Sequence, residues 1–208
     1  EVIRKIFKVN SYSQKSMIHT IIFDVGGTLV DAPDIFDIIS DSNKELKKKI
    51  IERFQFIYSG KKFYPVKEIL NKVMSGLSIN LPAEKIYSDT FVNKSYLFKE
   101  TLEVLESMKD KVALIIVSDA DSDVLIPELK RLGIYKYFSK ILISSDFRAY
   151  KPSDKFVKKI LPFFKSPYYD ILFVGDSSVD METAKKIGAR SVYIRRTEKN
   201  LKADYEIT

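Results

Sequence analysis

Five short, continuously apolar segments, separated by stretches of helical periodicity, limit the possible folds of this chain more than any other feature. They are rich in β-branched residues and occupy residues 20–24, 112–117, 141–143, 171–174 and 192–194. Apolar runs of this kind are typical of strands that are covered on both faces, as in parallel sheets. Strands that alternate with helices predict an α/β fold built on a doubly wound parallel sheet.

The intervals between these segments carry signals for helix starts and ends. Asp123 is placed to cap a helix that ends near Gly133. Pro152 is placed as the first residue of another helix, because its missing N–H costs nothing there. A third helix is expected from Met181 to Gly188, since glycine often ends a helix.

Residues 32–97 interrupt the alternation of strands and helices. Their apolar residues fall at helical spacing, and no further strand is predicted among them. The sequence therefore predicts a small all-helical domain at residues 32–97, inserted into a core made of residues 17–31 and 98–208. Residues 1–16 are expected to be an N-terminal extension.

Composition restricts the chemistry. The chain has 208 residues, no cysteine and one histidine, His19, so a thiolate site, a cysteine nucleophile and a multi-histidine zinc site are excluded. Carboxylates, lysine, serine and threonine remain for catalysis. The net charge of +7 comes from 35 basic and 28 acidic residues that alternate along the chain, which favours a solvated surface over a nucleic-acid partner.

The sequence also indicates where the protein works. No apolar run approaches the roughly 20 residues of a membrane-spanning helix, and no leader segment is evident, so we expect a cytoplasmic protein with no membrane partner. The absence of cysteine, the scarcity of glutamine and the abundance of lysine and isoleucine resemble a heat-adapted composition.

Polar side chains cluster where the predicted strands end. Asp24 follows the first strand, Ser118 and Asp119 the second, Asp176 the fourth, and Lys151 precedes the fourth. Ligands of an open parallel sheet bind beyond the carboxyl ends of its strands. Carboxylates and a backbone carbonyl suit Mg²⁺, a carboxylate can act as a nucleophile, and lysine and hydroxyl groups can hold phosphoryl oxygens.

This ordered set of motifs resembles the haloacid dehalogenase superfamily. The resemblance covers most of residues 18–208. It rests on the Phe-Asp-Val-Gly-Gly-Thr-Leu segment at residues 23–29, on Ser118, on the Lys-Pro pair at residues 151–152, and on the Gly-Asp-Ser-Ser-Val-Asp segment at residues 175–180. In that family, an insert like residues 32–97 is a helical cap.

The resemblance implies a role for each motif residue. Asp24 attacks phosphorus, while Asp24, the main-chain carbonyl of Gly26 and Asp176 bind Mg²⁺. Asp180 supports the metal or orients Lys151, although it could instead cap the helix near Met181. The residues implied to bind the phosphoryl group or the substrate are Thr28, Ser118, Asp119 and Lys151.

One position departs from the family pattern. Phosphatases of the family carry a second aspartate two residues after the nucleophile, and here that residue is Gly26. General acid–base help is worth about 10²–10⁴ in rate. We therefore expect weak activity on alkyl phosphates and less loss on aryl or acyl phosphates. A substitute acid could come from Asp119 or from the cap.

Three functions follow from these observations. The first is hydrolysis of a small phosphorylated metabolite. The second is carbon–halogen hydrolysis by the same aspartate, since the family's dehalogenases also lack the second aspartate, although they typically lack the metal-binding one that Asp176 matches. The third is a phosphate-ligand binding or regulatory protein with little turnover. The aromatic residues of the cap could line a substrate pocket, but their helical spacing favours packing in its core; they are Phe54, Phe56, Tyr58, Phe63 and Tyr64.

Overall fold

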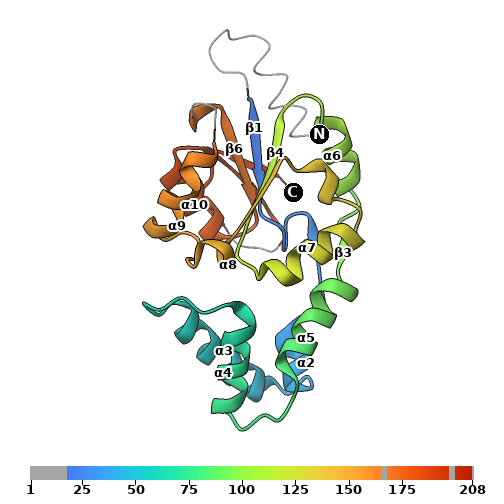
Figure 1. The fold of residues 1–208 in the computed structure, drawn as a ribbon, viewed down its shortest axis with the longest axis vertical. Coiled ribbons are helices and arrows are strands. Elements are labelled where there is room, and N and C mark those ends of the chain that lie inside the picture. Colours follow the sequence, from blue (N-terminus) through green and yellow to red (C-terminus); the bar gives the residue numbers. More distant parts are fainter. Residues whose placement is uncertain (1–17, 165–167, 197–199, 208) are drawn as a thin grey trace.

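A six-stranded parallel sheet forms the centre of the computed structural model, which describes residues 18–164, 168–196 and 200–207 (Figure 1). The strand order is β5-β4-β1-β6-β7-β8. The chain builds the sheet outward from β1 through β4 to β5 and then crosses to β6 on the other side of β1. The strands are β1 (Thr20–Phe23), β4 (Ala113–Ser118), β5 (Lys140–Ile143), β6 (Ile171–Gly175), β7 (Arg190–Ile194) and β8 (Tyr205–Ile207).

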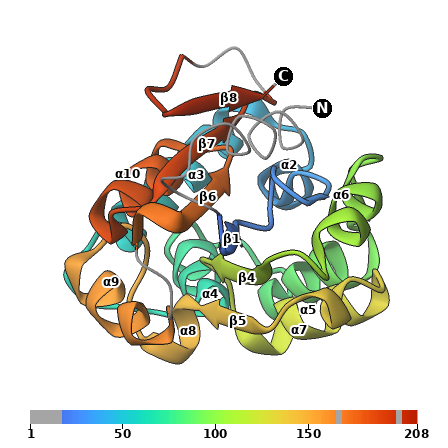
Figure 2. The same cartoon turned by 90° about the horizontal axis from the view of Figure 1, so that it is seen from above.

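Helices cover both faces of the sheet (Figure 2), which explains why its strands are apolar without alternation. One face packs against α6 (Thr101–Met108) and α7 (Ser122–Arg131). The other packs against α9 (Asp154–Ile160) and α10 (Ser178–Ile187). Within β1, Ile21 and Phe23 enter the first of these cores and Ile22 enters the second. The predicted α/β doubly wound sheet is therefore confirmed.

A group of helices lies beyond the carboxyl ends of the strands (Figure 1). It has its own apolar core, in which Ile50, Ile69 and Val73 are fully buried. Two chain segments connect it to the sheet, and they pair as the short antiparallel strands β2 (Val30–Asp31) and β3 (Tyr96–Leu97). We call this the helical group; its members are α2 (Ile35–Ser40), α3 (Lys44–Tyr58), α4 (Val66–Gly76), α5 (Ala83–Ser88) and the π-helix η1 (Asp89–Asn93).

Local helix starts differ from the sequence prediction. The N-cap residue of α7 is Asp121 and not Asp123. Ser153 caps α9, so Pro152 precedes that helix. Helix α10 starts about a turn before Met181. The remaining short elements are α8 (Ser144–Phe147) and the 3₁₀ turns η2 (Tyr135–Tyr137), η3 (Leu161–Phe163) and η4 (Tyr168–Asp170).

The ends of the chain differ in what the structure describes of them. The predicted extension at residues 1–16 lies outside the described residues. Strand β8, which the sequence analysis did not predict, extends the sheet beside β7. Among the helices of the described ranges, none combines the length and the apolarity that crossing a bilayer requires.

Candidate active site

Asp24 lies at the carboxyl end of β1, where the strand order reverses. Its backbone N–H donates to the carbonyl of Val174 at 2.9 Å, so the end of β6 holds it in place. A tight loop follows, in which the N–H groups of Thr28, Leu29 and Val30 all donate to the carbonyl of Val25. A reversal of strand order opens a crevice at this edge of a sheet, and ligands of such folds bind there.

Lys151 joins the first and fourth motifs through its side chain. Its Nζ donates to Asp24 Oδ1 at 2.7 Å and to Asp180 Oδ1 at 2.7 Å. Burial alone would lower the pKa of Lys151, but the charges of Asp180, Asp24 and Asp119 outweigh it and raise the pKa above its ordinary value. Lys151 is therefore a buried ammonium held between two carboxylates.

Asp180 has two structural roles at once. Its Oδ2 accepts from the N–H of Ser177 at 3.1 Å and from the Ser177 hydroxyl at 2.5 Å, completing the capping box of α10. Its Oδ1 holds Lys151. Asp180 therefore both helps to cap α10 and bonds Lys151, as the two alternatives from the sequence proposed. The N-cap residue itself is Ser177.

Asp176 completes an acidic cluster with Asp24 and Asp180. One carboxylate oxygen from each lies within 4.8 Å of the other two. Burial raises the pKa of Asp24 to about 7, although the charge of Lys151 opposes the rise. When all three carboxylates are ionised, the cluster and the Lys151 ammonium together carry two negative charges. Hard oxygen donors with an excess of two negative charges fit a divalent cation such as Mg²⁺.

The two glycines of the loop differ in what surrounds them. A Cβ built on Gly27 would lie 2.2 Å from Asp176 Oδ2, and Gly27 has a φ of +70°, so only glycine fits there. A Cβ built on Gly26 would have no atom within 4 Å. Gly26 therefore leaves open space where the family's phosphatases carry a side chain.

Asp119 links the sheet to the helical group. Its Oδ1 accepts from the backbone N–H of Lys151 at 3.0 Å, and its Oδ2 accepts from the Tyr58 hydroxyl at 2.7 Å. Burial raises the pKa of Asp119. Of the two hydroxyl residues predicted for the site, Ser118 is 6% exposed and lines the cavity described below. Thr28 is buried, and its Oγ1 has no hydrogen-bond partner within the part of the chain that the structure describes.

Two contacts between the sheet and the helical group were missed by the sequence analysis. Tyr58 packs against the core of the helical group as expected, but its hydroxyl also bonds Asp119, and its ring centroid lies 4.2 Å from that of Tyr150. The expectation of core packing is wrong for Phe56, which is 80% exposed. Asp121 accepts from the N–H groups of Val66 and Lys67 and so caps α4. A signal for the second contact exists in the sequence, because Pro65, the N-cap residue of α4, has no side chain that can cap a helix.

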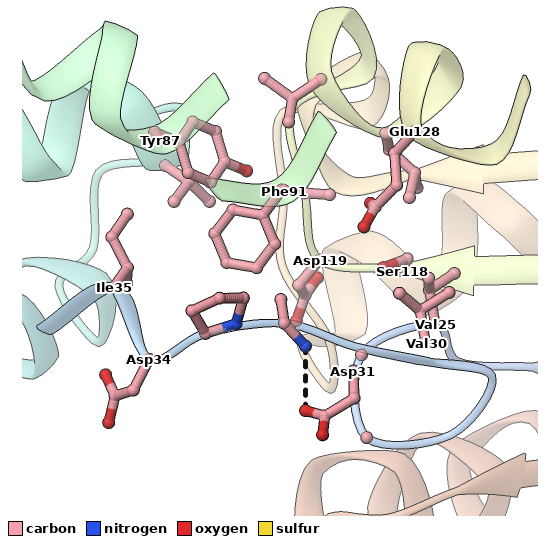
Figure 3. A pocket seen from close by; sticks show the side chains of 18 of the residues that line it. Val25, Val30, Asp31, Asp34, Ile35, Tyr87, Phe91, Ser118, Asp119 and Glu128 are labelled. Carbon is pink, nitrogen blue, oxygen red and sulfur yellow. Dashed lines mark hydrogen bonds between the residues drawn. The ribbon is translucent and has the colours of Figure 1, made fainter. Parts of the chain in front are cut away.

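A cavity of about 440 Å³ lies between the loop after β1, the residues after β4 and the helical group. The carboxylates of the acidic cluster do not line it, but the loop that follows Asp24 does. The floor of the cavity includes Gly26, Gly27 and Ser118. Figure 3 shows Phe91 from η1 and Glu128 from α7 facing Ser118 and Asp119 across this space. A volume of several hundred Å³ is typical of a small-molecule site.

Comparison with known proteins agrees with this geometry. Residues 21–194 match the family model described as haloacid dehalogenase-like hydrolase. A phosphoglycolate phosphatase of Aquifex aeolicus is 28% identical over 188 residues, covering 82% of each chain. PpaX of Caldanaerobacter subterraneus subsp. tengcongensis, a candidate pyrophosphatase, is 26% identical over 183 residues, covering 86% of this chain and 82% of that one.

A solved structure has the same fold. The candidate HAD hydrolase YfnB of Bacillus subtilis, bound to magnesium, superposes with a TM-score of 0.75 at 18% identity, covering 92% of this chain and 95% of that one. The match to the family model spans most of the sequence and includes every residue predicted for the site. The chain belongs to the haloacid dehalogenase-like hydrolases.

Proposed function

We propose that the protein is a magnesium-dependent hydrolase of small phosphate monoesters that works through an aspartyl-phosphate on Asp24. The observation that carries the proposal is the placement of the Asp24, Asp176 and Asp180 carboxylates within 4.8 Å of one another, with a buried Lys151 bonded to two of them. The family and the relatives named as phosphatases support the same reaction class.

The first step forms a covalent intermediate. Lys151 bonds Oδ1 of Asp24, so we assign the attack on phosphorus to Oδ2. A new O–P bond forms as the ester P–O bond breaks, and the leaving oxygen departs with the bonding pair as an anion, which is then protonated by solvent. Water then attacks the phosphorus, releasing phosphate, restoring the Asp24 carboxylate and losing a proton to solvent.

The surrounding residues prepare this step. Lys151 and Ser118 bind the phosphoryl oxygens, while Asp180 and Asp119 hold Lys151 by its ammonium and its backbone N–H. Thr28, whose Oγ1 is buried without a partner among the described residues, is assigned the same positioning role. Asp24, Asp176 and the carbonyl of Gly26 would hold Mg²⁺, which supplies positive charge next to the phosphoryl group.

Gly26 provides no acid for the leaving group. Esters of good leaving groups, such as aryl or acyl phosphates, are therefore the favoured substrates, because their oxygen leaves without a proton. The helical group is assigned as the cap, at residues 32–97, over a core of residues 17–31 and 98–208. In this role it encloses the leaving group and excludes water.

The test is release of phosphate from phenyl phosphate with magnesium and with a chelator. Asp24→Asn should abolish turnover, because an amide is a poor nucleophile, while retaining the far-UV circular dichroism of the wild type. Full activity in the chelator, or in Asp24→Asn, contradicts the proposal. Binding of phosphate without any turnover in the wild type would instead favour the phosphate-binding module.

Gly26 also favours a second candidate, hydrolysis of a carbon–halogen bond by Asp24. This reaction needs no acid at position 26, because halide leaves without a proton. Halide release from 2-chloropropionate, unaffected by a chelator, would support it. Retention of Asp176 in the acidic cluster favours the phosphatase.

A further inference from the structure

The composition of the cavity restricts the leaving group. We call the part of the cavity lining that comes from the helical group the roof. Aromatic rings form most of it, and they come from four elements: Phe36 from α2, Phe54 and Tyr58 from α3, Tyr87 from α5 and Phe91 from η1. Aliphatic side chains fill the gaps between them. A ligand that replaces water along these surfaces gains binding in proportion to its own apolar area.

The acidic and basic side chains that line the cavity are all carboxyl groups. They belong to Asp31, Asp34, Asp119 and Glu128, and none of the described residues that line it is a lysine, an arginine or a histidine. Glu128 is 4% exposed, so its carboxyl group is removed from most of the solvent. A second anion on a substrate would meet these carboxyl groups and no cation in the lining.

Cations on the neighbouring helices already have partners. Lys47 of α3 bonds Asp34 and Asp37, each at 2.8 Å. Lys67 of α4 bonds Asp123 at 2.5 Å. Arg131 of α7 donates to the carbonyls of Val92 and Ser95. The two lysines are paired with carboxylates, and Arg131 keeps its charge but is held by hydrogen bonds at a position that does not line the cavity.

We infer that the physiological substrate carries a single anionic group, its phosphoryl group, on an uncharged aromatic or bulky apolar leaving group. The inference rests on the proposed function and deepens it. Phosphoglycolate, with a carboxylate, and pyrophosphate, with a second phosphoryl group, are then poor substrates, in contrast to what the names of the relatives indicate for those proteins.

The experiment compares phenyl phosphate with its 3-carboxy derivative. The two phenols have similar acidity, so the pair differs in charge and hardly in the quality of the leaving group. We expect kcat/KM to be at least about tenfold higher for phenyl phosphate, mainly through KM. Equal values, or preference for the carboxylated ester or for phosphoglycolate, overturn the inference while leaving the phosphatase proposal intact. Turnover of none of these esters overturns both.

Two variants test whether the cavity is the cause. Phe36→Lys places a cation on a half-buried lining position and should reduce the ratio between the two esters to near one. Phe56→Lys is the matched control, because Phe56 lies on α3 outside the cavity lining and is 80% exposed; it should keep the wild-type ratio. If Phe36→Lys fails to fold, Ala32→Lys on the segment between β2 and α2 makes the same test. An unchanged ratio in a folded variant overturns the inference.

Discussion

The charged carboxyl edge of the sheet and the roof that the helical group forms over the neighbouring cavity differ in chemistry. The edge concentrates Asp24, Lys151, Asp176 and Asp180, and the ion pairs there are almost fully buried. The roof is mostly aromatic. Under the proposed function, the comparison teaches that reaction and selectivity are built separately: the charged edge would carry out the chemistry, and the apolar roof would select the group to which the phosphoryl group is attached.

The largest expected effect is at the charged edge. Lys151→Met leaves the Asp24 and Asp180 carboxylates buried without their cation, so we expect kcat to fall by about 10³ or more. The free energy of unfolding should fall by about 3 kcal/mol, because breaking a buried ion pair leaves uncompensated charge in the folded protein. Phosphate release and urea denaturation measure the two effects.

A surface lysine provides the control for this variant. Lys186 bonds Asp154 at 2.9 Å, where the Asp154 side chain is 77% exposed. In Lys186→Met, the free energy of unfolding should fall by less than about 1 kcal/mol, and the activity should stay unchanged. Equal losses in both variants would remove the distinction between the charged edge and the ordinary surface.

The next effect tests the missing acid. Gly26→Asp has open space for its side chain, so the variant should fold normally. We expect the hydrolysis of an alkyl phosphate such as ethyl phosphate to rise by about 10², with little change for phenyl phosphate. Gly27→Ala, whose Cβ would collide with Asp176, should lose activity on both esters. No gain for the alkyl ester in Gly26→Asp would show that another residue already supplies the proton.

A third effect belongs to the wall of the cavity and depends on pH, because Glu128 lines the cavity from α7. Burial raises the pKa of Glu128 from 4.5 to about 7, against the Ser95 hydrogen bond and the charge of Arg131. Because the folded pKa lies above the unfolded one, the stability that protonated Glu128 contributes is full below pH 4.5 and is lost as pH rises through about 7. The loss should be about 3 kcal/mol.

Glu128→Gln isolates this contribution. The free energy of unfolding of the wild type, measured by urea at pH 5 and pH 8, should decrease more with pH than that of the variant. Comparing the two proteins is necessary because burial also raises the pKa values of Asp119 and Asp121, which act in the same direction. If the free energy of unfolding changed equally with pH in the wild type and in Glu128→Gln, the raised pKa of Glu128 would be contradicted.

The smallest effect lies at the contact between edge and roof. Tyr58→Phe removes the hydrogen bond to Asp119 and keeps the ring beside Tyr150. We expect a loss of about 1–2 kcal/mol in stability and a modest rise in KM. Tyr96→Phe is the matched control, because the Tyr96 hydroxyl bonds Asp31 at an exposed position, and it should change little. A larger loss in the control would contradict the role of the buried contact.

The sequence predicted the sheet better at its centre than at its edge. Strands β1, β4, β5, β6 and β7 are apolar because most of them are covered on both faces, and that pattern is readable without a structure. Strand β8 spans only Tyr205–Ile207 and is partly exposed, so it lacks the pattern. Strands β2 and β3 are two residues long, which is too short for any periodicity.

Within the candidate site too, some features could be predicted from the sequence and others could not. The motif residues at the charged edge were predictable because few side chains can perform their chemistry, and the structure brings Asp24, Lys151, Asp176 and Asp180 together. The bond between Tyr58 and Asp119 was not predictable, because the two residues lie 61 positions apart and only tertiary packing joins them.

The shared carboxylate of Asp180 has a consequence for reading genetic variation in this protein. The start of α10 and the position of Lys151 depend on the same side chain, so a change at Ser177 would displace a reacting group about as readily as it would fray a helix. A substitution at Ser177 that looks like the loss of a helix cap would then lower the rate of the enzyme before it measurably lowers the melting temperature.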